Sequence, residues 1–316
     1  MGRLSLAMAL TVIVSSAVSA RAQESNAPLP TFKSSVEVVP ISAVVHDRRG
    51  RMVTSLTAAD FEIIDKGQKR QILDFQSDRS SPITLAILID TSGSMRVGAK
   101  LAFARDVLRH LAGQLENGRD EVSLFTFDSA LHEQQPFTMQ LASLGSALND
   151  ADPFGVTSLY DAIAETARKL ADRPTPRRAI IVLTDGLDTS SALTAPEVSG
   201  LASSIDVPVY VVATVPPIDY ATYVDRGVLS TTGAATGDLR DLAQWTGGEL
   251  LWVTGDLEAA VQARQIVSEL RHQYLITFEP SSAPEWRPID VRVRDRKMTV
   301  RARSGYFSGG AKPAMQ

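Results

Sequence analysis

The chain has 316 residues, of which 44% are hydrophobic and 22% are charged, an ordinary balance for a globular protein of one large or two modest domains. It carries 32 basic and 36 acidic residues, a net charge of −4, whereas a nucleic-acid-binding protein needs a basic surface to displace phosphate counterions. Cysteine is absent, which excludes disulfide bonds, a thiol nucleophile and zinc–thiolate sites. The composition therefore argues against nucleic acid as a partner.

Residues 1–22 have the pattern of a secretory signal peptide, and residues 23–34 follow as a linker. Arg3 supplies a short positive region, and Leu4–Val18 is almost continuously apolar. Ala20-Arg21-Ala22 then fits the small-x-small pattern that signal peptidase recognises. An uncleaved anchor or a buried core helix are the alternatives, although a core helix would show a polar face. We expect an exported protein, periplasmic or secreted, without a membrane span after cleavage.

Residues 35–78 form a β-rich segment. Turn residues separate its strands, since Asp47–Arg51 and Asp65–Gly67 combine charged residues with glycine. The expected elements are strands in Val36–Val45 and a hairpin of Phe61–Ile64 and Gln71–Phe75.

Residues 79–273 alternate between apolar runs and helical patterns. Ile83–Ile89 is short and rich in β-branched residues, which is typical of a strand covered on both faces of a parallel sheet. Apolar residues at three- and four-residue spacing between Leu101 and Leu115 then indicate a helix. Further strands are expected at Val122–Phe127, Ala179–Thr184, Val207–Ala213 and Glu249–Val253, and further helices at Leu159–Leu170, Ala195–Ser203, Leu239–Thr246 and Leu257–His272. This alternation predicts an α/β fold with a doubly wound, mostly parallel sheet, which binds ligands at the carboxyl ends of its strands.

A long connection, Thr214–Asp238, separates the strand Val207–Ala213 from the next helix. Connections of this length are usually functional or disordered. Because it leaves the carboxyl end of a parallel strand, it begins at the edge of the sheet where ligands bind. Tyr220, Tyr223 and Arg226 are candidate partner contacts, and a flexible loop without a binding function is the alternative.

Three short strands are expected near the end of the chain, at Tyr274–Phe278, Ile289–Val293 and Met298–Ala302. Residues 274–307 should pack with residues 35–78 as one small β-rich flanking domain, because neither end alone could easily bury a sheet face. Residues 308–316 are expected to form a disordered tail.

Three predicted loops bring oxygen-bearing side chains to one edge of the central sheet. Asp90, Ser92 and Ser94 follow its first strand. Thr157 precedes the second helix, and Asp185 follows the third strand. Two carboxylates and three hydroxyls, without nitrogen or sulfur, suit Mg²⁺ best, with Mn²⁺ or Ca²⁺ as alternatives, and disfavour zinc or copper. Without a cation, the two aspartates should repel each other.

Each of these residues also has a structural interpretation. Aspartate or serine after a strand is commonly a helix N-cap, and either Thr157 or Ser158 could cap the helix that follows. Asp185-Gly186 is also an ordinary turn pair. Their joint presence, in the right order and at the right places on the βα pattern, favours the metal site.

The pattern Asp90-x-Ser92-x-Ser94, with Thr157 and Asp185 downstream, resembles the metal-ion-dependent adhesion site (MIDAS) of von Willebrand factor A (VWA) domains. The resemblance implies a Rossmann-like VWA fold in residues 79–273. It implies that the three hydroxyls bind the cation directly and that both aspartates act mainly through bound water. One coordination position would stay open for an Asp or Glu carboxylate of a partner protein.

The fold resemblance spans about Ile83 to His272, and Val156 departs from it, since many family members have a glycine there. The flanks resemble a VWA-related domain of acidobacterial secreted proteins. The matching residues are Asp47, Gly50, Val53, Leu56, Asp60-Phe61, Asp65, Gly67, Thr246-Gly247-Gly248 and Arg303-Ser304-Gly305-Tyr306.

An enzyme is not expected. Asp90-Thr91-Ser92-Gly93 superficially resembles the active-site turn of aspartic proteases, but no second copy exists to share a proton. The chain also lacks a G-x-S-x-G nucleophile elbow and a G-x-x-x-x-G-K-[ST] phosphate loop, and its four histidines lack metal-ligand spacing.

We predict an exported bacterial adhesion protein that captures a partner's acidic group through a divalent cation. The first alternative is a structural or assembly scaffold whose VWA domain binds partners without metal. A hydrolase is a weaker third alternative.

Overall fold

The computed structural model describes residues 38–77, 79–145, 148, 151–186, 188–216, 237–281 and 285–308. The expected signal peptide and linker, the tail after residue 308 and most of the long connection, with Tyr220, Tyr223 and Arg226, lie outside the described residues. Val36–Gln316 forms one compact unit. Within the described ranges, no helix combines the length and the apolar character needed to cross a membrane.

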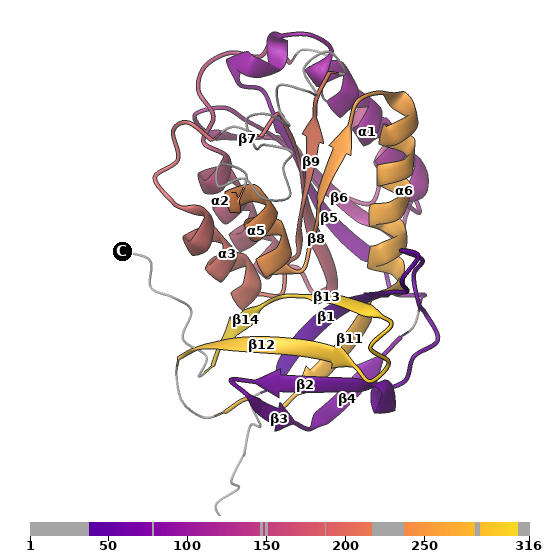
Figure 1. The fold of residues 1–316 in the computed structure, drawn as a ribbon. Coiled ribbons are helices and arrows are strands. Elements are labelled where there is room, and N and C mark those ends of the chain that lie inside the picture. Colours follow the sequence, from indigo (N-terminus) through magenta and orange to yellow (C-terminus); the bar gives the residue numbers. More distant parts are fainter. Residues whose placement is uncertain are drawn as a thin grey trace, which may run out of the picture. The chain divides into compact units, whose positions relative to one another are not determined.

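The centre of this unit is a six-stranded sheet with the strand order β10-β9-β8-β5-β6-β7 (Figure 1). All neighbouring strands are parallel except β6 and β7, which are antiparallel. The strands are β5 (Ile83–Asp90), β6 (Glu121–Phe127), β7 (Leu131–Thr138), β8 (Arg177–Thr184), β9 (Val209–Thr214) and β10 (Leu250–Val253). The prediction of a mostly parallel α/β sheet is confirmed.

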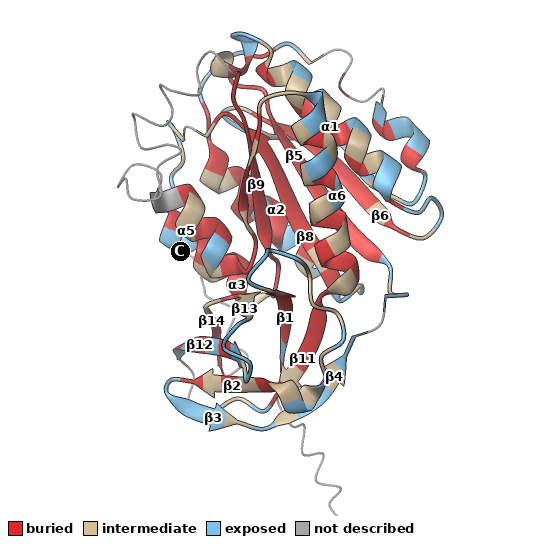
Figure 2. Ribbon diagram, turned by 45° about the vertical axis from the view of Figure 1, so that its right-hand side comes forward, coloured by how far each residue is buried: buried red, intermediate tan, exposed pale blue. Residues whose placement is uncertain are grey.

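Helices cover both faces of this sheet (Figure 1). One face carries α1 (Lys100–Gln114) and α6 (Asp256–His272), and the other carries α2 (Leu159–Ala171), α3 (Ala195–Ser204) and α5 (Gly237–Thr246). Successive side chains of β5 point to opposite faces of the sheet. Ile87 and Ile89 therefore belong to the apolar core on one face, and Ala86 and Leu88 belong to the core on the other. Every residue of β5 is buried (Figure 2), as a strand covered on both faces requires.

β7 was not predicted from the sequence. Its residues are exposed or half-buried, and they include Pro136. The strand lies at the edge of the sheet and pairs only with β6, through a ladder with two register shifts. Proline is tolerated at an edge because no neighbour needs its missing amide hydrogen. Because β7 is polar and pairs with one strand only, its sequence lacks the continuous apolar run that identifies a strand covered on both faces.

The two ends of the chain fold together into two four-stranded sheets (Figure 1). One has the order β13-β1-β11-β4 and the other β14-β12-β2-β3. The strands are β1 (Val39–His46), β2 (Phe61–Asp65), β3 (Gln68–Arg70), β4 (Ile72–Gln76), β11 (Tyr274–Phe278), β12 (Trp286–Val293), β13 (Thr299–Ala302) and β14 (Gly305–Phe307). Ile41 and Phe61 share one buried apolar cluster with Ile276 and Val291. The predicted flanking β domain, built from both ends, is confirmed.

The predicted hairpin between Phe61–Ile64 and Gln71–Phe75 is wrong. β2 turns at Lys66 and Gly67, whose φ angles are 48° and 82°, and pairs with the short strand β3. β4 instead enters the other sheet and pairs with β11. The sequence pattern misled because β3 is polar throughout, so the next apolar run looked like the natural partner of β2.

The Thr246-Gly247-Gly248 turn joins the central sheet to the flanking sheets. The Thr246 hydroxyl accepts a hydrogen bond from the Val209 N–H (3.0 Å) in β9. A Cβ on Gly248 would lie 2.0 Å from the Val209 carbonyl oxygen. Gly247 has a φ of +87°, and a Cβ there would lie 2.9 Å from the Arg303 nitrogen. Only glycine fits at either position.

A buried ionic network crosses the same junction. Arg301 of β13 bonds to Glu269 of α6 and to Glu249 (2.5 Å), and its guanidinium lies over the Tyr210 ring. Glu269 is 1% exposed and also lies 3.5 Å from His46 of β1. Burial acts to raise the pKa of Glu269, but hydrogen bonds and positive charges, chiefly from His46 and Arg301, outweigh it and lower that pKa. Charge pairing therefore stabilises this junction in the ionised state of Glu269.

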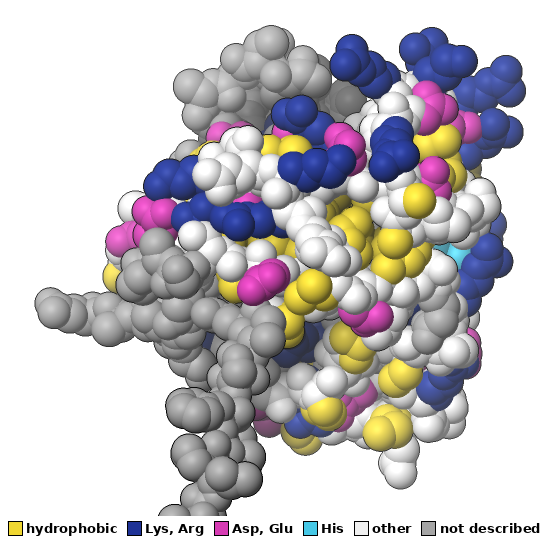
Figure 3. Space-filling view, turned by 90° about the horizontal axis from the view of Figure 1, so that it is seen from below, with side chains coloured by type: hydrophobic (Ala, Val, Ile, Leu, Met, Phe, Trp, Pro, Cys, Tyr) yellow, Lys and Arg dark blue, Asp and Glu magenta, His cyan; other side chains and the backbone are white. Residues whose placement is uncertain are grey.

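The face of the flanking sheets that points away from the central sheet carries many charges. Figure 3 shows Lys and Arg side chains gathered toward one side of this face, with Asp and Glu among them. On the strands of these sheets, Lys69 pairs with Glu62 (2.6 Å) and Arg292 pairs with Asp290 (2.5 Å). The basic side chains therefore do not form an uninterrupted positive surface.

Candidate metal centre

Asp90 is the last residue of β5 and is fully buried at the carboxyl edge of the central sheet. Its Oδ1 accepts a hydrogen bond from the Ser92 N–H (2.8 Å), and its Oδ2 accepts one from the Thr184 hydroxyl (2.6 Å). Burial raises the pKa of Asp90 to about 6 against the effect of these hydrogen bonds, and the charge of Asp185 contributes in the same direction. A cation next to Asp90 would favour its ionised form.

The turn after β5 brings the hydroxyls of Ser92 and Ser94 together. Ser92 precedes the 3-10 turn η2 (Gly93–Arg96), and the two Oγ atoms lie 3.1 Å apart. The Gly93 N–H donates to the Gly155 carbonyl (3.0 Å), and a Cβ on Gly93 would lie 3.4 Å from that oxygen. The hydrogen bond therefore holds the loop before α2 against the turn that carries the two serines.

Thr157 lies at the end of that loop and is 3% exposed. The segment after β8 fixes its backbone, since the Thr157 N–H donates to the Thr189 hydroxyl and the Thr157 carbonyl accepts from the Ser190 N–H (both 3.0 Å). These contacts hold Thr157 in place without using its hydroxyl.

Capping does not explain the residues before α2. Ser158 occupies the N-cap position, but its side chain makes no capping hydrogen bond. The first amides of α2 bond to the segment after β8 instead: the Leu159 N–H donates to Asp188 Oδ1 (2.8 Å) and the Tyr160 N–H to Ser191 Oγ (3.0 Å). The interpretation of Ser158 as a side-chain cap is therefore wrong.

Asp185 follows β8 and is fully buried. Its Oδ2 accepts a hydrogen bond from Lys100 Nζ (2.9 Å), which also donates to the Ser94 carbonyl (3.3 Å). Its Oδ1 is buried without a hydrogen-bond partner. A buried carboxylate oxygen without a hydrogen-bond partner is energetically costly. We therefore infer that a ligand or a water molecule binds this oxygen, since no protein group does.

Lys100 is a site residue that the sequence analysis misses. It is the first residue of α1 and is only 6% exposed. Lysine is rarely buried without a partner, and nothing in the helical pattern of α1 distinguishes this one from an exposed surface residue. Only the fold shows that it contacts Asp185, 85 residues further along the chain.

The five predicted ligands, Asp90, Ser92, Ser94, Thr157 and Asp185, all lie where these three segments meet. They offer carboxylate and hydroxyl oxygens, including the unpaired Asp185 Oδ1. This donor set fits a hard divalent cation, which prefers oxygen. Among the described residues, no group of three or more His, Cys, Asp or Glu side chains could hold a metal. A cation at this edge would therefore depend on the hydroxyls.

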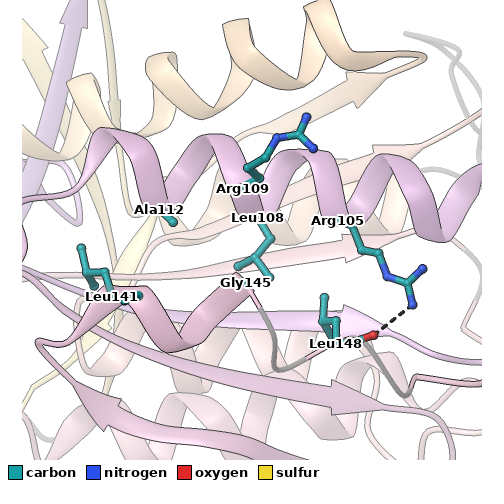
Figure 4. Close-up of a pocket in the computed structure, with 8 residues that line it drawn as sticks. Arg105, Leu108, Arg109, Ala112, Leu141, Gly145 and Leu148 are labelled. Carbon is teal, nitrogen blue, oxygen red and sulfur yellow. Dashed lines mark hydrogen bonds between the residues drawn. The ribbon is translucent and has the colours of Figure 1, made fainter.

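A separate pocket of about 340 Å³ lies between α1 and the short helix η3 (Leu141–Gly145) (Figure 4). Arg105 and Arg109 line it together with apolar side chains such as Leu108. Arg105 donates to the Leu148 carbonyl (2.9 Å). None of the five predicted ligands lines this pocket, so it is not part of the metal centre.

The family model of the von Willebrand factor type A domain matches residues 85–187. The chain contains a von Willebrand factor type A domain. The match begins in β5 and ends just after Asp185, so all five predicted ligands fall within it. The narrower resemblance of the flanks to acidobacterial secreted proteins stays a prediction.

The solved structures that are similar to parts of the chain include the following three. BatB, a conserved hypothetical protein from Bacteroides thetaiotaomicron, is 21% identical over 59% of this chain and 98% of its own, with a TM-score of 0.47. The von Willebrand factor type A protein from Catenulispora acidiphila is 12% identical over 86% of this chain and 75% of its own, with a TM-score of 0.49. Proximal thread matrix protein 1 from the mussel byssus, with a zinc-occupied MIDAS motif, is 15% identical over 64% of this chain and 48% of its own, also with a TM-score of 0.49. Similarity at this level supports no conclusion about what this chain binds. No curated protein sequence matches the chain.

Proposed function

We propose that this VWA protein holds a divalent cation, Mg²⁺ in the first place, at the carboxyl edge of its central sheet and uses it to bind an acidic group of a partner protein. One observation carries the proposal: the buried Asp185 Oδ1 lacks a partner at the edge where the Ser92, Ser94 and Thr157 hydroxyls lie. Oxygen ligands of both kinds are what Mg²⁺ uses in proteins, where it also keeps several waters.

Each residue has a separate part in this proposal. Ser92, Ser94 and Thr157 would bind the cation through their hydroxyls, and Asp90 and Asp185 would act mainly through bound water. When bound, the cation supplies an open coordination position with positive charge. Thr184 and the Ser92 amide hold the Asp90 carboxylate in place, and they do so whether or not it contacts the cation.

Charge at this edge favours an acidic partner. Asp90 and Asp185 together contribute two negative charges when ionised, and the buried Lys100 ammonium next to Asp185 compensates one of them. A divalent cation would then leave one net positive charge, which a single carboxylate neutralises. A partner's Asp or Glu would form a charge-assisted bond that neither protein could form alone.

Calorimetry on the full chain tests the proposal. Mg²⁺ is titrated first, and a partner or an acidic peptide is titrated in Mg²⁺ and again in EDTA. Asp90→Ala, Thr157→Ala and the double variant Ser92→Ala/Ser94→Ala should lose Mg²⁺ binding and partner binding together. Ser129→Ala is the matched control, because this exposed residue follows β6 at the same edge and its hydroxyl donates to Asp128, which is not one of the proposed ligands. Partner binding that survives both EDTA and Asp90→Ala would show that the metal-dependent function is wrong.

We also propose that the protein is exported and is not an enzyme. No histidine contacts the site: His46, His110, His132 and His272 contact Glu269, Asp256, Asp128 and the Ser268 carbonyl, respectively. A nucleophile at this edge would therefore lack a neighbouring imidazole base. Export is tested by mass spectrometry of the native protein, which should find an N-terminus at or near Gln23.

The alternative function is a scaffold that binds partners without metal. The Lys100–Asp185 ion pair favours it, because the ammonium already provides a positive charge at this edge. In that case partner binding should persist in EDTA and should depend on Lys100.

A further inference from the structure

Three large apolar side chains are exposed on the loops that carry the proposed cation ligands. Val97 is 63% exposed, Phe154 is 76% exposed and Val156 is 47% exposed. We propose that these three residues form an apolar collar around the cation site, which binds apolar side chains on either side of the partner's acidic residue. This inference rests on the proposed function and adds the chemistry of the partner's recognised segment.

The position of each collar residue follows from the backbone of the site. The Val97 N–H donates to the Ser94 carbonyl (3.3 Å), which closes the turn that carries Ser94. The Phe154 N–H donates to the carbonyl of Thr91 (2.8 Å), between the two ligands Asp90 and Ser92. Val156 directly precedes Thr157. All three collar residues therefore border the ligands on the same two loops.

Tight turns keep the collar in place. Gly98 and Gly155, next to collar residues in the chain, have φ angles of +68° and +87°, which favour glycine. A Cβ on Gly98 would also lie 3.1 Å from Pro216 Cγ, so the loop after η2 packs closely there. These turns fix the backbone of both loops. Three large apolar side chains left exposed on the backbone next to the proposed ligands are suited to contact with a partner bound at the cation.

Nearby charges leave apolar contact as the main means of recognition at the rim. Arg96, next to Val97, pairs with Asp152 (2.5 Å), and Lys100 pairs with Asp185. In the exposed pair, the charges of Arg96 and Asp152 therefore compensate each other. The remaining unsatisfied positive charge belongs to the bound cation, which one carboxylate neutralises. The rim and the cation together therefore complement a carboxylate flanked by apolar groups.

This pattern selects one class of occupant. A glutamate or aspartate between aliphatic or aromatic side chains in a protein segment has such flanks, whereas the carboxylate of an acidic sugar is surrounded by hydroxyls. Covering the collar would also exclude water from the cation. Because electrostatic attraction strengthens as the local dielectric constant falls, exclusion of water would strengthen the bond between cation and carboxylate. Collar and cation should therefore act together.

The experiment uses the full chain in Mg²⁺ and two immobilised synthetic peptides, each with one central glutamate. One peptide has leucine and phenylalanine next to the glutamate, and the other has serine and asparagine. The peptide with apolar flanks should bind at least about tenfold more tightly, which corresponds to 1.4 kcal/mol. Phe154→Ala should remove this difference and leave the affinity for Mg²⁺ alone, measured by calorimetry, unchanged. Leu73→Ala is the control, because Leu73 is 45% exposed but lies on β4 of the flanking sheets.

The outcomes separate this inference from the proposed function. Equal, EDTA-sensitive binding of both peptides, or no effect of Phe154→Ala, would overturn the collar and leave the metal-dependent function intact. Tighter binding of an acidic oligosaccharide than of either peptide would also overturn the collar. Binding that persists in EDTA would instead count against the proposed function. If neither peptide binds in Mg²⁺ at about 1 mM, both are wrong.

Discussion

The ion pair between Lys100 and Asp185 leads to a stability prediction that depends on its burial. The Nζ–Oδ2 distance is 2.9 Å, and both residues are buried. At an effective dielectric constant of about 20, two unit charges at this distance attract each other by about 6 kcal/mol. Removing both from water costs several kcal/mol per ion, so the intact pair contributes little net stability. Removing one partner leaves the other charge buried and unpaired, which costs roughly 3–5 kcal/mol.

Asp185→Asn should therefore destabilise the protein in EDTA by about that amount, and Lys100→Met should do the same. The double variant should be close to wild type, because it buries neither charge. Repulsion between Asp90 and Asp185 alone would predict the opposite for Asp185→Asn, a variant at least as stable as wild type. Lys100 reverses that expectation by compensating the Asp185 charge.

Urea denaturation of the four proteins at pH 7, first in EDTA and then in Mg²⁺, measures the coupling between the two residues. Adding Mg²⁺ should restore stability to Lys100→Met, because the cation replaces the ammonium, and should not restore it to Asp185→Asn. The matched control is the same cycle on Lys69 and Glu62, a pair with an equally direct contact that is exposed to water and should show much weaker coupling. If Asp185→Asn in EDTA is as stable as wild type, the ion pair does not act as argued.

Three further features are testable by stability measurements. Gly248→Ala should lower the melting temperature, because its Cβ would lie 2.0 Å from a backbone oxygen. The control Gly200→Ala lies in α3 with open space around it and should stabilise the protein by roughly 0.5–1 kcal/mol. Equal effects of the two substitutions would contradict the packing argument. Because the pKa of Glu269 is lowered in the folded state, its stabilising effect is present above the unfolded value of 4.5 and is lost as pH falls through the folded pKa. Wild type should thus lose more stability than Glu269→Gln in denaturant titrations as the pH falls from 5 to about 2, and parallel losses would refute this. Mg²⁺ at a hundredfold excess over its Kd should stabilise wild type by about 2.7 kcal/mol in a thermal scan, and an equal shift in Thr157→Ala would place the ion elsewhere.

The sequence by itself determined the central fold and the identity of the five candidate ligands. β5 is apolar except for Thr84 and its last residue, Asp90, and it is buried along its whole length, so the nearly continuous apolar run was enough to predict a strand covered on both faces. Ligands at strand ends are also found from sequence, because the carboxyl ends of parallel strands meet at one edge whatever the details of packing. For this reason Asp90, Ser92, Ser94 and Asp185 could be brought together without coordinates. Thr157 could be added because it precedes a crossover helix, which begins at the same edge of the sheet.

The flanking sheets were predictable only in part. Apolar strands at both ends of the chain indicated that the ends pack together, since neither could bury a sheet face alone. Pairing was not predictable, because β3 is polar and β4 pairs with β11, about two hundred residues away. A strand's partner in such a sheet is chosen by tertiary packing, and local pattern favours the nearest apolar run.

Only the tertiary structure decided the electrostatics of the metal centre and the surface around it. Lys100 becomes a buried counter-charge because the start of α1 lies against the end of β8, and helical periodicity carries no information about that contact. Val97, Phe154 and Val156 are ordinary apolar residues in the sequence, and their exposure depends on turns fixed by bonds between separate loops. Spacing along the chain determines which groups reach the edge of the sheet. Which of them are paired, buried or exposed depends on contacts between distant segments, and this is decided when the chain folds.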